Sequence, residues 1–133
     1  MSYRMQRRVD DEFDRVVSRT EAALSEEGFG VLSDIDVRAA FEEKLGLEGY
    51  PRYRILGACN PALAREGLDA EPDLGALLPC NVVVREEAAG DVVVSAVDPG
   101  AMLSVVENAA LDPIAEDVDA RFRRVLDAVA DGE

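Results

Sequence analysis

Apolar side chains recur along this chain with two different periods, and the changes from one period to the other mark its predicted elements. Residues 2–9 alternate apolar and polar side chains, which is typical of a half-buried strand. Residues 10–28 repeat apolar side chains at every third or fourth position, the spacing of an amphipathic helix, between a capping Asp10 and a terminal Gly28. The chain is therefore predicted to begin with a strand and a long helix.

The same change of period occurs twice more before the middle of the chain. Residues 29–35 resume the strand period, and Asp36 then caps a second predicted helix. Residues 52–59 form a third predicted strand. Asn60 and Pro61 follow it directly, and asparagine at the cap with proline at the first helical position is a favoured helix start. A short third helix is therefore expected over the sequence PALAREGL.

The C-terminal half contains a predicted hairpin and two further helices. Two valine-rich strands, CNVVVREE and DVVVSAV, are separated by a short link that contains glycine, which indicates a hairpin at the centre of a sheet. Asp98-Pro99 and Asp112-Pro113 then repeat the combination of cap and proline. They predict a short helix and a long final helix.

These elements predict an α+β fold of two layers, with the order β-α-β-α-β-α-β-β-α-α. We expect a curved, five-stranded antiparallel sheet with short helical insertions. The two long helices, over residues 10–28 and 113–130, are expected to pack side by side on one face of this sheet, because their apolar stripes need the same core.

Length and composition predict one domain over residues 1–133. Its content of 48% hydrophobic and 32% charged residues excludes the disordered class. No apolar run approaches the roughly 18 residues of a membrane span, and the N-terminus is charged at once, unlike a signal peptide. We therefore expect a cytoplasmic protein that does not bind membranes.

The charge balance narrows the expected partners further. The chain has 28 acidic and 14 basic residues, for a net charge of −14. Such a surface repels nucleic-acid phosphates and anionic lipid headgroups, so neither is an expected partner. It also suits high salt, where repulsion is screened within roughly 3 Å at 1 M. We interpret the charge as adaptation to salt, as in a halophilic archaeon; an acidic protein from a GC-rich bacterium is the alternative.

The absence of histidine excludes several kinds of site. Neither a Ser-His-Asp nor a Cys-His nucleophile can form within the chain, and no histidine can bind zinc or haem iron. Two cysteines cannot provide four thiolates. We therefore predict no catalytic residue, no metal site and no cofactor.

Four residues remain as candidates for a ligand or redox site: Cys59, Asn60, Cys80 and Tyr53. Cys59 precedes a predicted helix N-terminus, which lowers the pKa of a nearby thiol, and Cys80 is its possible redox or metal-binding partner. Both cysteines are otherwise read as small buried hydrophobic residues that stay reduced. Asn60 is either a helix cap or an amide that faces a ligand. Tyr53 shares a strand face with Ile55, which favours core packing over a reactive phenol.

Four segments in this order resemble the family called domain of unknown function 302, DUF302. They are ILGACNPALA, LGALLPCNVVV, the valine hairpin, and DPGAML with the helix that follows it. The resemblance extends from residue 13 to residue 129. It implies a fold like that of the TATA-box-binding protein, with a curved sheet cradling helices, and it often implies a homodimer. It implies no activity, because the family is named for lacking one.

The sequence therefore favours a non-catalytic homodimer that binds a small ligand or a partner between its sheet and its helices. The segments CNP and LLPC are expected at one rim of this concavity. Its walls are expected to come from Phe13, Val17, Phe41, Tyr53, Ile55, Val84 and Phe122. The alternatives are a thiol-based redox enzyme or sensor that uses Cys59 and Cys80, and a purely structural interaction module.

Overall fold

Five antiparallel strands form one sheet in the computed structural model, which describes residues 2–132. They are β1 (Arg4–Val9), β2 (Gly30–Asp36), β3 (Tyr53–Cys59), β4 (Cys80–Glu86) and β5 (Val92–Val97). Their order across the sheet is β1-β5-β4-β3-β2, so the predicted β4–β5 hairpin lies inside the sheet and β1 and β2 form its edges.

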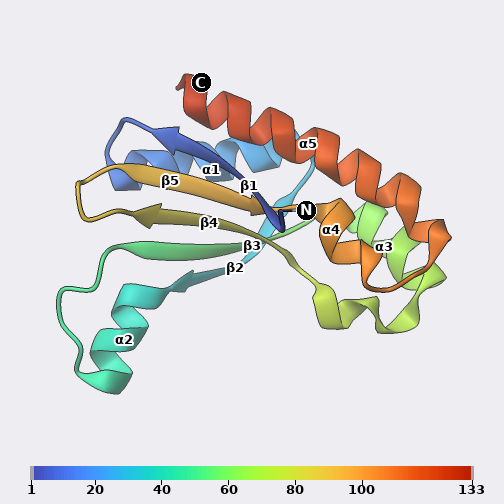
Figure 1. Cartoon of the computed structure of the whole chain (residues 1–133), viewed down its shortest axis with the longest axis horizontal. Helices are drawn as coiled ribbons and strands as arrows, with labels where there is room; N and C mark the ends of the chain where they lie inside the picture. The colour runs from blue at the N-terminus through green and yellow to red at the C-terminus, as the bar shows by residue number, and fades with distance from the viewer. Residues whose placement is uncertain (1, 133) are drawn as a thin grey trace.

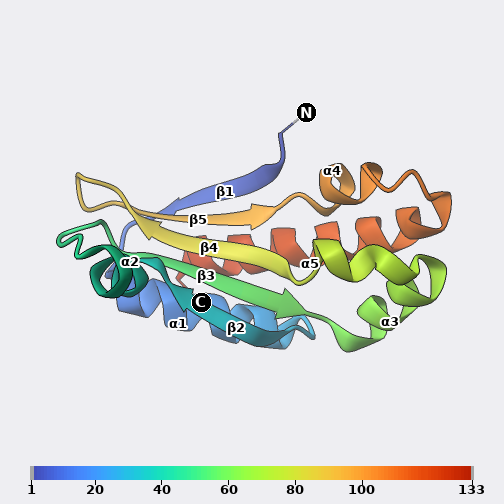
Figure 2. The same ribbon diagram turned by 90° about the horizontal axis from the view of Figure 1, so that it is seen from below.

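The helices lie on one face of this sheet or beyond its edge and end. They are α1 (Phe13–Glu26), α2 (Val37–Leu45), α3 (Pro61–Ala70), α4 (Pro99–Ser104) and α5 (Asp112–Asp131), with short 3-10 helices η1 (Pro72–Leu77) and η2 (Ala109–Leu111). The two long helices, α1 and α5, lie side by side against the sheet (Figures 1 and 2). The predicted fold class and order of elements are confirmed. No helix within residues 2–132 has the length and apolar character needed to cross a membrane.

The space between the sheet and the long helices is a filled core. Phe122 of α5 is fully buried, and its ring centroid lies 5.0 Å from that of Phe29. Four of the seven residues that were expected to wall a concavity here are buried in this core: Phe13, Val17, Val84 and Phe122. The predicted position of the concavity is therefore wrong, because these side chains occupy the space.

Three of the predicted helix caps are confirmed. The Asp36 carboxylate accepts a hydrogen bond from the Ala39 backbone N–H at 2.9 Å, at the start of α2. Asp98 does the same at the start of α4, where its carboxylate accepts from the backbone N–H of Ala101 at 3.1 Å. Asn60 caps α3 and is described with the site below. These bonds satisfy N–H groups that have no partner inside the helix.

The predicted caps of both long helices are wrong. Residues 10–12 connect β1 to α1, so the cap position is Glu12, which makes no side-chain cap bond. Asp112 lies in the first turn of α5, one residue after the cap position at Leu111. We attribute both differences to packing on the sheet, which sets where each helix starts. The expected capping residue therefore does not lie at the cap position.

The segment from β2 through α2 contains no buried residue. No residue of α2 is buried, and Figure 1 shows this helix beyond the β2 edge of the sheet, away from α5. Phe41, another expected wall residue, packs edge-on against Tyr50 with ring centroids 4.9 Å apart, outside the core. Leu32 and Leu45 remain 71% and 70% exposed. The apolar side chains of this segment therefore have little cover within the chain.

Candidate functional site

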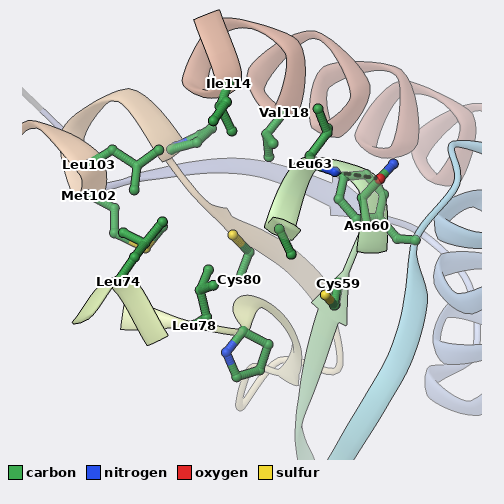
Figure 3. Close-up of a pocket in the computed structure, with 15 residues that line it drawn as sticks. Cys59, Asn60, Leu63, Leu74, Leu78, Cys80, Met102, Leu103, Ile114 and Val118 are labelled. Atoms are coloured by element: carbon green, nitrogen blue, oxygen red, sulfur yellow. Dashed lines mark hydrogen bonds between the residues drawn. The ribbon is translucent and has the colours of Figure 1, made fainter. Parts of the chain in front are cut away.

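Three of the four candidate residues meet at one end of the sheet. Cys59 is the last residue of β3, Asn60 follows it, and Cys80 is the first residue of β4. The antiparallel register pairs Ala58 with Cys80, so the end of β3 and the start of β4 lie next to each other. Cys59, Asn60 and Cys80 all line one pocket at this end, shown in Figure 3.

The rest of this pocket is apolar and comes from elements that are far apart in the sequence. Leu63 of α3, Leu74 of η1, Leu103 of α4, and Ile114 and Val118 of α5 surround the two thiols (Figure 3). The pocket volume is about 50 Å³. An engineered apolar cavity of about 150 Å³ binds benzene, so this one has room for a smaller group, such as the end of an alkyl chain.

Asn60 is fixed in place by its role at the start of α3. Its side-chain oxygen accepts a hydrogen bond from the Leu63 backbone N–H at 3.2 Å, which confirms it as a cap. Its amide nitrogen lies against Gly28, where a Cβ atom would come within 2.9 Å of it. Gly28 also has a φ of +87°, which favours glycine. The end of α1 thus fits closely against one wall of the pocket.

The Cys80 thiol is held in its protonated form. Burial raises its pKa to about 11, and the neighbouring Cys59 adds to the shift. A thiol with so high a pKa is a poor nucleophile at neutral pH, because the thiolate is the reactive form. Cys80 therefore serves the pocket mainly as a small apolar side chain.

The two cysteines are free and are not directly opposite each other in the sheet. Cys80 faces Ala58, while Cys59 is one residue further along β3. Cys80 and Ala58 therefore share the core-facing side of the sheet, whereas Cys59 lines the pocket from the end of β3. The sequence left open whether the two cysteines are close; the structure places both at this end of the sheet, but the register does not align them as a cross-strand pair.

Tyr53 lies away from this pocket. Leu56 and Ala58 are the β3 side chains that face the core, so Tyr53 and Ile55 point to the opposite, uncovered face of the sheet. The expected core packing of Tyr53 and its place in the same concavity are therefore wrong. Tyr53 lines a second hollow, of about 400 Å³, together with Arg4 and Arg85.

Sequence reasoning missed the apolar residues of η1, α4 and α5 that complete the pocket. It also missed the polar residues that line the hollow beside Tyr53: Gln6, Asn81 and Ser95. The alternation along β1, β4 and β5 was a usable signal for these three residues, because it assigns them to the face opposite the valines of the core.

Comparison with known protein families matches residues 5–129 to one described as "Domain of unknown function DUF302". The chain belongs to the DUF302 family. It is also similar to a solved structure, that of an uncharacterized conserved DUF302 protein from Bacillus stearothermophilus. The two are 30% identical, with a TM-score of 0.89 over 96% of this chain and 98% of that one. No curated protein matches the chain. The predicted family is confirmed, and the shared DUF302 fold includes the elements that form the pocket.

Proposed function

We propose that this DUF302 domain is a non-catalytic binding domain whose ligand inserts an apolar group into the pocket between the sheet end, α3, α4 and α5. One observation carries the proposal. The pocket is lined by mostly apolar side chains from six helices and strands, and its polar groups are already committed: Asn60 caps α3, and the Cys80 thiol stays protonated at neutral pH. Such a pocket holds apolar groups by burial from water.

The size of the pocket limits which part of a ligand it takes. A volume of about 50 Å³ excludes an aromatic ring without rearrangement. The pocket is open at one side, so a longer ligand would leave its remaining part outside. We therefore propose a ligand with an alkyl end.

Binding of 1-hexanol, a neutral alkyl probe, tests this proposal. We expect it to shift the NMR signals of Leu63, Leu103 and Ile114 before those of other residues. Ala64→Leu should weaken binding by about tenfold or more, because the added carbons fill the pocket that Ala64 lines.

Ala62→Leu is the matched control, because Ala62 is exposed on the same helix. It should bind hexanol as the unmodified chain does. Equal binding by the Ala64 and Ala62 variants would contradict the proposed site.

We also propose that the domain forms a homodimer through the β2–α2 segment. Four of the exposed large hydrophobic side chains lie in this segment or directly after it: Leu32, Ile35, Leu45 and Leu47. β2 is also an edge strand, with unpaired backbone groups along its outer side. A second copy related by a twofold axis would cover both features with the same segment of its own.

The double substitution Leu45→Ser and Leu47→Ser is expected to convert the dimer to a monomer. Sedimentation velocity over a range of protein concentrations measures this change. Val105→Ser is the control, because Val105 is equally exposed but lies on the α4 side of the molecule. A monomer in the unmodified chain at all concentrations would rule out this interface.

We further propose that the acidic surface is an adaptation to high salt. The chain has twice as many acidic as basic residues, so arginine ion pairs cannot neutralise most carboxylates. Screening should relieve the remaining repulsion, and the melting temperature should rise from ~0.1 M to ~2 M potassium chloride. Melting temperatures that stay flat across the series would remove this interpretation.

A further inference from the structure

We propose that the uncovered face of the sheet binds a small organic carboxylate with an apolar body. We call this surface the open face: the side of the sheet opposite α1 and α5, around the hollow lined by Arg4, Gln6, Tyr53, Asn81, Arg85 and Ser95. The hollow of about 400 Å³ lies within the range of small-molecule sites, roughly 300–1,000 Å³. It is separate from the apolar pocket.

The charged side chains that line this hollow are both basic, whereas the protein as a whole is acidic. The chain has 28 acidic residues, yet none of them lines the hollow, whereas two arginines do. If acidic residues were spread evenly over the surface, some carboxylates would line the hollow as well. The absence of carboxylates from the lining favours binding of an anion there.

Arg4 is the group most open to an anionic ligand. Every other arginine has a carboxylate oxygen within 4.0 Å, but no carboxylate within residues 2–132 lies that close to Arg4. Its guanidinium donates to the Ser2 hydroxyl at 3.0 Å and lies 5.4 Å from the centre of the Tyr3 ring. Arginine binds a carboxylate through two parallel hydrogen bonds, so a carboxylate supplies the partner that Arg4 lacks.

Arg85 occupies the other end of the hollow and has a partner. It pairs with Glu87 at 3.2 Å. Arg4 is opposite Val97 of β5 and Arg85 is opposite Val93 of the same strand, so the two arginines lie four residues apart along the strands. This is about 13 Å at the rise of a strand. A single carboxylate therefore binds at Arg4, with its apolar body directed along the hollow.

The floor of the hollow suits such a body. Val83 and Val97 provide apolar surface, and the Gln6 side chain donates to the Ser95 hydroxyl at 3.1 Å, which keeps both polar groups satisfied. A second copy of the open face is a poor occupant, because the lining of the hollow in both copies carries arginines and no carboxylate. Nucleic acid is also disfavoured, since the net charge of −14 repels its phosphates.

Phenylacetate and its uncharged analogue phenylacetamide, each titrated by NMR in ~50 mM salt, test the proposal. Phenylacetate should shift amide signals of β1, β4 and β5 around the hollow, and phenylacetamide should bind at least about fivefold more weakly. Arg4→Gln should weaken phenylacetate binding by about tenfold. Arg85→Gln should have a smaller effect.

Arg65→Gln is the control, because it removes the same charge from an exposed side chain on α3, outside the hollow. It should change the affinity less than about twofold. Equal effects of Arg4→Gln and Arg65→Gln would overturn the proposal, as would equal binding of the two probes or no shift at the hollow. Shifts of these signals with protein concentration alone would instead show a second copy on the open face and would also overturn it.

Discussion

Replacing Phe122 with alanine is expected to lower the free energy of unfolding by about 3 to 5 kcal/mol. Phe122 is fully buried between α5 and the sheet and contacts the Phe29 ring, so the substitution leaves a cavity in the centre of the core. Urea unfolding of both proteins, followed by circular dichroism at one salt concentration, measures the loss.

Val105→Ala is the control for this experiment. Val105 is 71% exposed, so its truncation should change the free energy of unfolding by less than about 0.5 kcal/mol. A loss below about 1 kcal/mol for Phe122→Ala would mean that α5 does not contribute to the core in the way described.

Cys80 is expected to react with iodoacetamide at pH 7 at least about a hundredfold more slowly than an exposed thiol. A pKa of about 11 leaves roughly one thiol in ten thousand as thiolate at this pH, against roughly three in a hundred for a free thiol of pKa about 8.5. Burial slows the reaction further. Mass spectrometry of the native and the denatured chain, with Cys59→Ser to isolate the Cys80 signal, measures the two rates.

The raised pKa of Cys80 also predicts how stability depends on pH. Its stabilising effect should be complete below pH ~9, where the unfolded chain also keeps the thiol protonated, and should be lost as pH rises through about 11.

Rapid labelling of native Cys80 at pH 7 would contradict its burial and favour the thiol-based alternative. Slow labelling supports the non-catalytic function.

The fold could be predicted because the sequence signals that define its helices and strands are local. A period near 3.6 residues defines α1 and α5, a period of two defines the strands, and Asn60 with Pro61 marks the start of α3. These signals depend only on nearby residues, so they do not require knowledge of the tertiary structure. The starts of α1 and α5 were less predictable. Three acidic residues, Asp10, Asp11 and Glu12, precede α1, and the cap position of α5 is Leu111, one residue before the expected Asp112.

The candidate site was predictable only in part. Cys59 and Cys80 stood out because each lies at a strand end, next to a proline or a helix start. The orientation of β3 was ambiguous, since Tyr53 and Ile55 form one apolar face and Leu56 and Ala58 form the other. Only tertiary packing decides which of these faces meets the helices.

The same limit applies to the β2–α2 segment. Phe41 and Leu45 follow the spacing of a helix that packs on a core, but no residue of α2 is buried. An apolar stripe predicts that a helix face is buried. It does not tell whether the same chain or another chain buries that face. The apolar stripes of α1 and α5 thus belong to the core, whereas the apolar side chains of the β2–α2 segment stay largely exposed.

Intermolecular nuclear Overhauser effects between bound 1-hexanol and the protein test the central claim most directly. The proposed function predicts contacts from the terminal methyl group of hexanol to the side chains of Met102, Leu103 and Ile114, which line the pocket. These contacts should disappear in the Ala64→Leu variant and persist in Ala62→Leu. Contacts confined to exposed side chains such as Leu45, or contacts that Ala64→Leu leaves unchanged, would contradict a ligand site in this pocket.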